Sequence, residues 1–436
     1  MRQYGGLGAP AAAGVFFLLF FALALYWGLF TWLAGHFWPI SWGPLLLPLL
    51  WVGLEFARAH LLTGFPWLLL GYALTDFFPI ARLARWTGVY GISCLLVAIN
   101  VAWVWFFLRR NRWAALHLAA LLCACGFLWL TAPQENYSTP HKVYLVQTRI
   151  PQEVAFESWD LNSQSALLER LERLTVEAAG RQDAPALVIW PEMPAPFYYW
   201  DDAFTRPFME NLARRTNSYF LSGIVAFVPG SRLRQPLNSN VLLDPGGRFL
   251  AQYDKIKLVP FGEYVPLKQW LGFTGTITAE AGDFVSGSRF VVSELLGGRM
   301  STLICYEAIF PELARRFVQE GAGLLVNISN DGWFGNSAAG VQHLLMARMR
   351  AIETARFLLR ATNTGITAVI RPDGKIAAAL APDQPAVLEA RWGFETRQTF
   401  YVRYGDWFPL GACLAVVAAG ALAARRAHRK PARGKR

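Results

Sequence analysis

Long apolar stretches dominate the first 132 residues of the chain, and one more lies near its end. A helix needs about 20 apolar residues to cross the hydrocarbon core of a bilayer. By this criterion the predicted membrane spans are residues 12–35, 40–57, 87–107, 113–132 and 407–424. The apolar segment 61–76 contains Gly64 and Pro66, which predicts a short broken span or a re-entrant segment. A signal peptide is the alternative for the first stretch, but its apolar run is too long and no small-residue cleavage site follows.

Between residues 133 and 405 the pattern changes to short β-rich runs separated by amphipathic segments. The predicted strands are Val143–Gln147, Leu187–Trp190, Tyr219–Phe227, Val241–Leu243, Phe249–Tyr253, Ser301–Ile304, Leu324–Ile328 and Thr367–Arg371. The predicted helices cover residues 161–179, 204–215, 310–319 and 340–356. Two segments with Pro and Gly, 244–247 and 371–374, predict hairpin turns. Strands that alternate with helices predict an α/β domain with a buried sheet.

Two clusters of basic residues predict the orientation in the membrane. Arg109, Arg110 and Arg112 separate two predicted spans, and residues 425–436 hold seven Lys or Arg and no acidic residue. Lys and Arg close to span ends resist translocation, so we expect both clusters in the cytoplasm. The chain then leaves the cytoplasm through the span at 113–132 and returns through the last span.

This topology predicts three parts of the chain: membrane helices over residues 1–132, an extracytoplasmic domain over 133–405, and a final helix with a basic cytoplasmic tail over 406–436. The composition agrees, because 54% of the residues are hydrophobic and 16% are charged, against about 25% charged in soluble proteins. The formal charge of +11 belongs to the membrane ends, and residues 133–424 carry about −1. A nucleic-acid partner is therefore not expected.

Cys305 is the one cysteine of the predicted extracytoplasmic domain. The other four lie within predicted spans, where they serve as small hydrophobic residues: Cys94, Cys123, Cys125 and Cys413. Cys305 ends the predicted strand at 301–304, and the residues after it lead into a predicted helix. A thiol at such a turn faces the positive end of the helix dipole, which lowers its pKa and favours an oxyanion nearby. We therefore expect a nucleophile, with an inert buried cysteine as the alternative.

A nucleophile also needs a base and a group that holds negative charge. Glu192 directly follows the apolar run that begins at Leu187, and Lys255 and Glu263 follow the strand that ends at Tyr253. A solvated turn residue is the alternative for each of them. His343 lies near the start of a predicted helix, and a structural or substrate-facing role is favoured over a Cys–His pair. No His, Cys and carboxylate cluster has the spacing of metal ligands, so no metal is expected.

These residues carry a family pattern. Glu192 after Trp-Pro, Lys255 in Tyr-Asp-Lys and Cys305 in Ile-Cys-Tyr-Glu, in this order, resemble the Glu-Lys-Cys triad of the nitrilase superfamily. Longer strings resemble the apolipoprotein N-acyltransferases, its membrane-embedded branch: Leu62–Trp67, Lys257–Pro266, Ile328–Gly335, Gln342–Ala351 and Arg360–Ala368. The resemblance implies a polytopic α-helical membrane protein with an inserted extracytoplasmic α/β nitrilase-like domain, an αββα sandwich.

The resemblance also implies roles for the site residues. Cys305 would attack an ester carbonyl of a phospholipid and form a thioester, with Glu192 as general base. Lys255 and the backbone N–H of Tyr306 would stabilise the oxyanion, and the supporting residues would be Glu263, Tyr306 and Glu307. The acceptor would be the α-amino group of the diacylglyceryl cysteine of an apolipoprotein, in the last step of bacterial lipoprotein maturation. No cofactor is implied.

The candidate substrate-binding residues are Phe156, Phe261, Asn330, Trp333 and His343. Apolar residues within 258–275 are predicted to form a mobile lipid-facing arm, with core packing of a loop as the alternative. The chain departs from the family pattern at two places. The family usually has two more membrane helices before the Gly-Gly at 5–6, a pair whose loss would preserve the orientation. Phe156 occupies a position where the family commonly has Trp, and Trp159 lies just beyond.

The expected partners follow from the implied reaction: a phospholipid acyl donor, a diacylated apolipoprotein acceptor and the lipid of the bacterial inner membrane. We expect a multi-pass monomer with its catalytic domain on the periplasmic side and its C-terminus in the cytoplasm. Three alternatives stay open: a membrane-tethered amidase that hydrolyses the thioester with water, a shortened and catalytically impaired paralogue, and a catalytically silent module that binds lipid or lipoprotein.

Overall fold

The computed structural model describes residues 8–110, 112–150, 161–194, 197–231, 233–265, 284–335, 337–382 and 384–428. Within them the chain forms two compact units. The helical unit comprises residues 14–134 and the C-terminal part from residue 403, and the α/β unit is built mainly from residues 135–402. The predicted change of pattern near residue 133 therefore coincides with a structural boundary.

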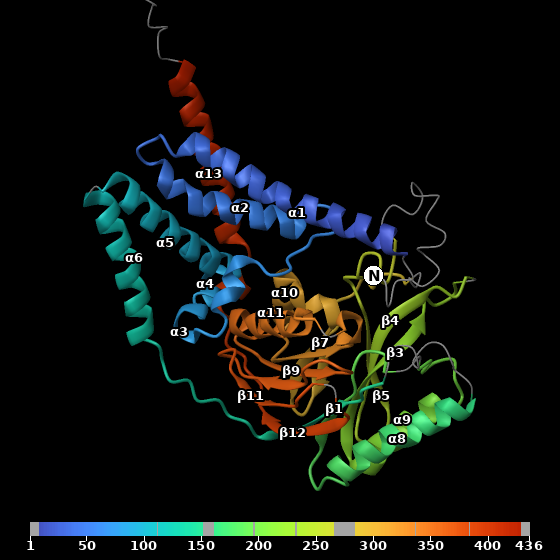
Figure 1. The fold of residues 1–436 in the computed structure, drawn as a ribbon. Helices are drawn as coiled ribbons and strands as arrows, with labels where there is room; N and C mark the ends of the chain where they lie inside the picture. Colours follow the sequence, from blue (N-terminus) through green and yellow to red (C-terminus); the bar gives the residue numbers. More distant parts are fainter. Residues whose placement is uncertain are drawn as a thin grey trace, which may run out of the picture. The chain divides into compact units, whose positions relative to one another are not determined.

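The helical unit contains five longer helices and four short ones within the described residues. The longer helices are α1 (Ala9–Phe37), α2 (Leu47–His60), α5 (Val89–Arg109), α6 (Arg112–Leu130) and α13 (Trp407–His428) (Figure 1). The short ones are η1 (Gly43–Leu46), η2 (Leu70–Leu74), α3 (Phe78–Ala81) and α4 (Ala84–Thr87). In the part of the chain that the structure describes, four helices are long and apolar enough to cross a membrane: residues 12–37, 89–109, 112–130 and 407–425.

The expected span over residues 40–57 is not one of these four. Its helix, α2, begins only at Leu47 because Pro44 lies in the 3-10 helix η1 and Pro48 lies in the first turn of α2, where proline is favoured. The 14 residues of α2 extend about 21 Å at 1.5 Å per residue. This helix is therefore shorter than the hydrocarbon core of about 30 Å.

The segment 61–76 is broken, as its Gly64 and Pro66 predict. Gly64 has a φ of 73°, and helical structure returns only in the short η2. The side chain of Glu55 in α2 attaches this segment to the bundle, because its Oε1 accepts a hydrogen bond of 2.7 Å from the backbone N–H of Leu70. The hydroxyl of Ser93 in α5 likewise accepts from the N–H of Gly71 at 2.8 Å. Backbone groups freed by the break thus find partners inside the unit, as lipid surroundings require.

Within its described residues, the α/β unit contains two six-stranded sheets. The first has the order β12-β1-β2-β3-β4-β5, and the second has the order β11-β10-β9-β8-β7-β6. The first six strands are β1 (His141–Gln147), β2 (Ala186–Ile189), β3 (Ser218–Phe227), β4 (Pro236–Leu243), β5 (Phe249–Asp254) and β6 (Ser293–Leu295). The other six are β7 (Gly298–Ile304), β8 (Leu324–Ser329), β9 (Phe357–Thr362), β10 (Ala368–Ile370), β11 (Ile376–Ala379) and β12 (Ala386–Trp392).

The centre of each sheet is parallel, and the outer strands are antiparallel. Strands β1, β2 and β3 run parallel in the first sheet, and β7, β8 and β9 run parallel in the second. Hairpins extend both sheets, and the β4–β5 and β10–β11 turns confirm the two predicted turns. A hydrogen bond of 3.1 Å from Asn240 in β4 to Thr302 in β7 joins the two sheets.

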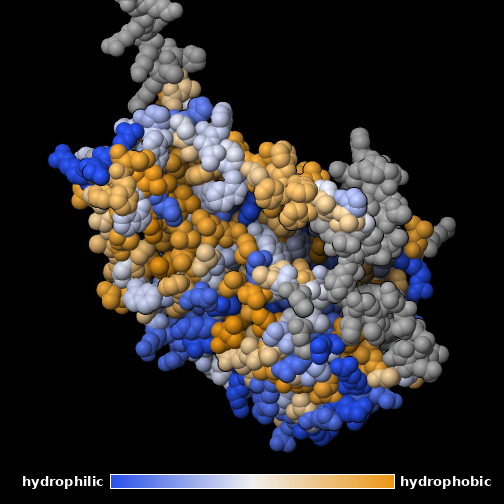
Figure 2. Space-filling view, viewed as in Figure 1, coloured by the Kyte–Doolittle hydropathy of each residue, from blue (hydrophilic) through white to orange (hydrophobic). Residues whose placement is uncertain are grey.

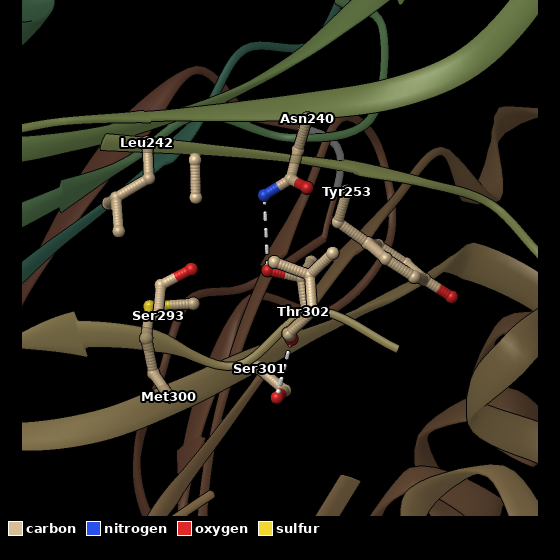
Figure 3. A pocket seen from close by; sticks show the side chains of 9 residues that line it. Asn240, Leu242, Tyr253, Ser293, Met300, Ser301 and Thr302 are labelled. Carbon is tan, nitrogen blue, oxygen red and sulfur yellow. Dashed lines mark hydrogen bonds between the residues drawn. The ribbon is translucent and has the colours of Figure 1, made fainter. Parts of the chain in front are cut away.

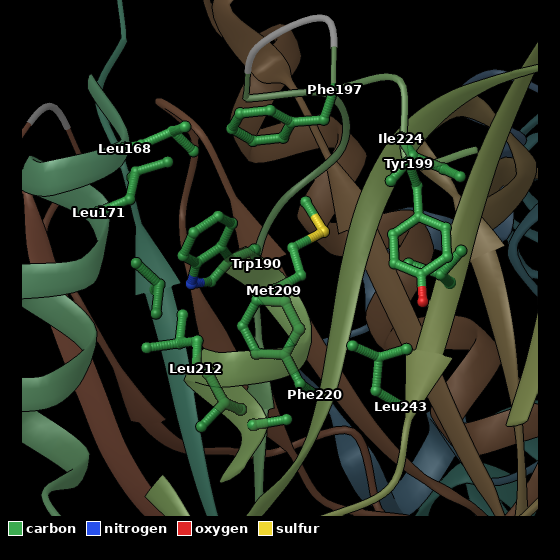
Figure 4. Packing of buried hydrophobic residues seen from close by; sticks show 14 of the residues in the cluster. Leu168, Leu171, Trp190, Phe197, Tyr199, Met209, Leu212, Phe220, Ile224 and Leu243 are labelled. Atoms are coloured by element: carbon green, nitrogen blue, oxygen red, sulfur yellow. The ribbon is translucent and has the colours of Figure 1, made fainter. Parts of the chain in front are cut away.

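Helices cover the outer faces of the two sheets, which completes the αββα sandwich (Figure 1). Helices α8 (Leu161–Ala179) and α9 (Thr205–Thr216) belong to the first sheet, and α10 (Pro311–Gln319) and α11 (Ala339–Thr354) belong to the second. The packing of α8 and α9 on the first sheet is centred on Trp190 and Phe220, whose rings lie 5.0 Å apart (Figure 4). All four predicted helices are confirmed to within two residues at each end.

Four strands were not predicted: β6, β9, β11 and β12. Two residues separate α11 from strand β9, and the reversal is made by one of them, Ala355, at a φ of 51°. Alanine gives no turn signal, so the predicted helix 340–356 continues two residues too far. Strand β11, with the sequence Ile-Ala-Ala-Ala, has no β-branched or aromatic alternation.

Candidate active site

The chemically reactive side chains follow the carboxyl ends of strands from both sheets. Glu192 lies three residues beyond β2, Lys255 directly follows β5, and Cys305 directly follows β7. Gly223 in β3 permits the close approach of the Glu192 segment. A Cβ atom there would lie 2.5 Å from the backbone nitrogen of Met193 and 2.9 Å from the Cα of Glu192. The structure therefore brings together residues that are more than a hundred positions apart in the sequence.

Two carboxylates enclose the ammonium group of Lys255. Its Nζ lies 3.2 Å from Glu192 Oε1 and 2.8 Å from Glu263 Oε1. The side chain of Lys255 is 1% exposed. Burial acts to lower the pKa of this ammonium, but the charges of Glu192 and Glu263 outweigh burial and hold the pKa above its usual range. Lys255 is therefore a fixed cation inside the domain.

Asn238 in β4 holds the same two carboxylates. Its Nδ2 donates to Glu192 Oε1 at 2.8 Å and to Glu263 Oε1 at 2.7 Å. The second oxygen of Glu192 accepts from the backbone N–H of Asn330 at 2.9 Å, and that of Glu263 accepts from the N–H of Val259 at 2.8 Å. Each carboxylate is thus oriented by donors at both oxygens, which fixes its position relative to Lys255.

Cys305 is buried and has a φ of 51°, a left-handed conformation that is uncommon for a residue other than glycine. It begins the five-residue 3-10 helix η3 (Cys305–Ile309). Its thiol lies within electrostatic reach of Glu192, Lys255 and Asp331. The candidate nucleophile, the acid and the cation therefore share one buried site.

The expectation of a lowered thiol pKa is wrong. Burial raises the pKa of Cys305, the negative charge of Glu192 raises it further, and Lys255 counteracts only in part. The α-helix expected after Cys305 begins only at Pro311, because the five residues of η3 intervene. The resting sulfur is consequently a neutral thiol, which needs a base before it can attack.

Glu307 connects the Lys255 segment with the Cys305 segment. It is fully buried, and its Oε1 accepts from the hydroxyl of Tyr253 at 2.7 Å and from the N–H groups of Ile256 and Lys257 at 2.7 and 3.1 Å. Its Oε2 accepts from the N–H of Ile304 at 2.8 Å. Burial raises the pKa of Glu307 to about 7 in spite of these donors. This side chain therefore joins the segments that follow β5 and β7, which belong to different sheets.

Tyr306 lies beside Cys305, with its side chain buried. Its ring packs edge-on against Phe310 at 5.1 Å between centroids, and burial raises the pKa of its phenol well above the usual range. The hydroxyl therefore stays protonated, and the residue offers the site an aromatic wall and its main-chain N–H.

His343 in α11 is buried beneath Cys305. Its Nε2 lies 3.0 Å from the main-chain oxygen of Cys305, and its Nδ1 lies 3.0 Å from Asp331 Oδ1. Arg360 donates to the other oxygen of Asp331 at 2.6 Å. Burial would raise the pKa of Asp331, but Arg360 and His343 hold it well below its usual range. A buried chain of charged and polar groups therefore ends at the backbone of the candidate nucleophile.

Of the remaining candidate residues, Asn330 contacts the site directly, because its backbone N–H donates to Glu192. Asn330 is buried, and Phe261 and Trp333 expose 58% and 47% of their surface. Phe156 and most of the predicted arm over residues 258–275 lie outside the described residues. In the part of the chain that the structure describes, no group of three or more His, Cys, Asp or Glu side chains is placed to hold a metal ion.

Sequence reasoning missed Asn238, Asp331 and Arg360, which orient the charged groups. Their signal is a polar residue at a buried position of a strand or directly after one. Asn238, for example, lies in the polar run Asn-Ser-Asn over residues 238–240 of β4. A short polar run is also typical of a loop, so its burial had to be known before it pointed to a site.

A small cavity lies between the two sheets, near Asn240 and Thr302 (Figure 3). Its volume of about 10 Å³ corresponds to roughly one water molecule. It is lined by Tyr253 and Met300 among others, and it is too small for either predicted substrate.

Comparison with known proteins defines the class to which this fold belongs. Residues 142–399 match the carbon-nitrogen hydrolase family, and residues 1–102 match the apolipoprotein N-acyltransferase N-terminal domain. Among solved structures, yeast Nit3 of the nitrilase superfamily is 20% identical, with a TM-score of 0.45 over 60% of this chain and 93% of that chain. The α/β unit is a carbon-nitrogen hydrolase domain.

Curated relatives narrow the class to one family. The chain is 40% identical to the apolipoprotein N-acyltransferase of Geobacter metallireducens, across 98% of this chain and 83% of that protein. It is 34% identical to the apolipoprotein N-acyltransferase of Azotobacter vinelandii, again across 98% and 83%. This chain belongs to the apolipoprotein N-acyltransferase family, and it is a multi-pass protein of the inner membrane.

Proposed function

We propose that this protein transfers a fatty acyl chain from a membrane phospholipid, through a thioester on Cys305, to the α-amino group of the diacylglyceryl cysteine of an apolipoprotein. The observation that carries this proposal is the ion-paired set of Glu192, Lys255 and Glu263, in which Glu192 and Lys255 lie within electrostatic reach of the buried Cys305 thiol. Family membership supplies the two substrates. The topology of basic residues supports a catalytic unit on the periplasmic side and a cytoplasmic C-terminus.

In the first half-reaction Glu192 takes the thiol proton while the sulfur of Cys305 attacks the ester carbonyl. A base is required because burial disfavours the thiolate. The carbonyl oxygen becomes an oxyanion, which the Lys255 ammonium and the N–H of Tyr306 stabilise. The C–O bond then breaks, the lysophospholipid oxygen takes the proton back from Glu192, and the acyl group remains on sulfur.

In the second half-reaction the amine of the apolipoprotein attacks the thioester. Glu192 accepts a proton from the nitrogen, and the same donors stabilise the second oxyanion. The C–S bond breaks and the sulfur regains its proton, so that an amide is formed and the thiol is restored. Both substrates are anchored in the bilayer, so the membrane helices keep the site close to them and raise their effective concentration.

A product assay tests this proposal. The purified protein is incubated with phospholipid vesicles and a synthetic diacylated lipopeptide, and the lipopeptide is analysed by mass spectrometry. We expect the lipopeptide to gain one acyl mass as an amide. We expect no gain with Cys305→Ala and normal activity with Cys413→Ala, whose sulfur lies in helix α13. Free fatty acid without acylated lipopeptide would instead identify a hydrolase and overturn the transfer.

A further inference from the structure

His343 contacts the main chain of Cys305 and not its sulfur atom. The Nε2 atom of His343 lies 3.0 Å from the main-chain carbonyl oxygen of Cys305. A carbonyl oxygen can only accept a hydrogen bond, so Nε2 must carry the proton and donate it. The histidine therefore binds the backbone of the nucleophilic residue.

The position of the imidazole ring is determined from its other side. Asp331 Oδ1 lies 3.0 Å from Nδ1, and Asp331 is itself held by Ser329 Oγ at 2.8 Å and by Arg360 Nη2 at 2.6 Å. Arg360 also contacts Asn327. All of these side chains are at least nine-tenths buried, and the strands β8 and β9 carry or adjoin them. A side chain bound in this way has little freedom to turn.

One peptide group links this histidine to the proposed oxyanion site. The C=O of Cys305 and the N–H of Tyr306 belong to the same planar peptide, and in a trans peptide they point in opposite directions. A donor that fixes the carbonyl therefore also fixes the direction of the N–H. This control matters here because Cys305 has a φ of 51°, a conformation that L-residues adopt only with support from the surrounding structure.

We propose that His343 is a positioning residue, which locks the Cys305–Tyr306 peptide so that the N–H of Tyr306 faces the acyl carbonyl. The ring binds the main chain, so its effect reaches the reaction through that N–H and not through a proton transfer at sulfur. This inference rests on the proposed acyl transfer and names a further residue that the oxyanion requires.

Two substitutions of similar shape separate this role from simple packing. His343→Gln keeps an N–H donor near the position of Nε2, whereas His343→Met fills similar space without any donor. Two reactions of Cys305 are then compared for each variant. In acyl loading from phospholipid vesicles, the sulfur attacks a carbonyl carbon and an oxyanion forms. In alkylation by iodoacetamide, the sulfur attacks an sp³ carbon and no oxyanion forms. Both are followed by the intact mass of the protein.

Loss of a direct oxyanion donor slows reactions by about 10²–10³-fold, and a misaligned donor should cost somewhat less. We expect His343→Met to load acyl groups at least roughly 10-fold more slowly while its alkylation rate stays within about threefold of the unsubstituted protein. His343→Gln should recover most of the loading rate. Parallel loss of both reactions in His343→Met, or equal loading by the two variants, would overturn the positioning role.

A third variant keeps the test informative if His343→Met does not fold. His343→Asn places an amide near the position of Nδ1, so that it keeps the contact with Asp331 and loses the one with Cys305. The same selective loss of loading is expected, and unaltered loading would again overturn the inference. If the unsubstituted protein itself gains no acyl group, the proposed function is wrong. If the unsubstituted protein and the variants all gain the acyl group at the same rate, only the positioning role of His343 is wrong.

Discussion

The helical unit and the α/β unit differ in how many charged side chains they bury. Hydrophobic side chains gather on the surface of the helical unit, where Phe17 in α1 and Leu414 in α13 expose 66% and 71% of their surface (Figure 2). Among its described residues, Glu55 is the one buried side chain of the Asp, Glu, Lys, Arg and His types. The α/β unit buries whole groups of charges, among them Lys255 with Glu192.

The difference shows what each unit needs its polar groups for. Lipid offers no hydrogen-bond partners to backbone groups. In the helical unit Glu55 therefore accepts a hydrogen bond from the N–H of Leu70, in the segment where the helix is broken. The α/β unit encloses charges in a medium of low dielectric constant, where each one acts strongly on its neighbours. Such enclosure is unfavourable unless the charges are paired, and the pairing of Lys255 with two carboxylates meets this condition.

The largest effect is expected from Lys255→Met, which leaves two carboxylates buried without their cation. Breaking a buried ion pair in this way costs about 3–5 kcal/mol of folding stability. Acyl loading of Cys305 should fall by roughly 10³-fold or more, since the oxyanion loses a charged donor. Intact mass and thermal unfolding in detergent measure both effects. The control is Lys142→Met at an exposed ion pair, and equal changes in the two variants would contradict the special role of the buried pair.

A smaller effect is expected from Gly223→Ala, because the added Cβ meets the backbone on both sides of Glu192. Overpacking of this kind costs about 1–3 kcal/mol, and displacement of the base should slow loading by roughly 10²-fold. Gly411→Ala in α13 is the matched control, because nothing lies within 4 Å of its added Cβ. Loading by Gly223→Ala at the rate of this control would show that β3 does not hold the Glu192 segment.

The pH dependence of stability should reflect Glu307, whose pKa burial raises to about 7. A carboxyl group with a raised pKa binds its proton more tightly in the folded state, so its contribution to stability falls as the pH rises from about 4.5 to about 7. The loss is of the order of 3 kcal/mol at most. Unfolding in detergent across this pH range measures it, and Glu307→Gln should have a flatter profile. Identical slopes would exclude Glu307 as the titrating group.

The last effect, on stability alone, is expected in the helical unit. Glu55→Gln keeps an oxygen that can accept from Leu70, whereas Glu55→Leu leaves that N–H without its acceptor. The leucine variant should lose about 1–3 kcal/mol relative to the glutamine variant. Comparison of their unfolding temperatures checks this expectation. If Glu55→Leu proves as stable as Glu55→Gln, the hydrogen bond does not secure the broken segment.

Much of the α/β unit could be predicted from the pattern of the sequence, because buried strands and amphipathic helices have different periods. The prediction failed where a residue without a turn signal reverses the chain, as Ala355 does between α11 and β9. The span over 40–57 was overestimated because hydropathy does not register that proline fixes the start of α2.

The residues of the candidate site could be predicted from the sequence, but the burial and the charges around them could not. Glu192, Lys255 and Cys305 each follow a strand, and this placement is visible in the sequence. The sign of the thiol pKa shift was wrong, since burial and the charge of Glu192 depend on distant segments. Asn238, which binds both carboxylates, carries no charge and lies inside a strand, so no local pattern indicated it.

The most direct measurement is peptide mass spectrometry of the protein after exposure to phospholipid vesicles alone, followed by addition of diacylated lipopeptide. The peptide that contains Cys305 should gain one acyl mass that hydroxylamine removes, as expected of a thioester, and the lipopeptide should then take up that acyl group. An unmodified Cys305 beside an acylated lipopeptide, or an acyl group on another residue, would contradict transfer through this sulfur.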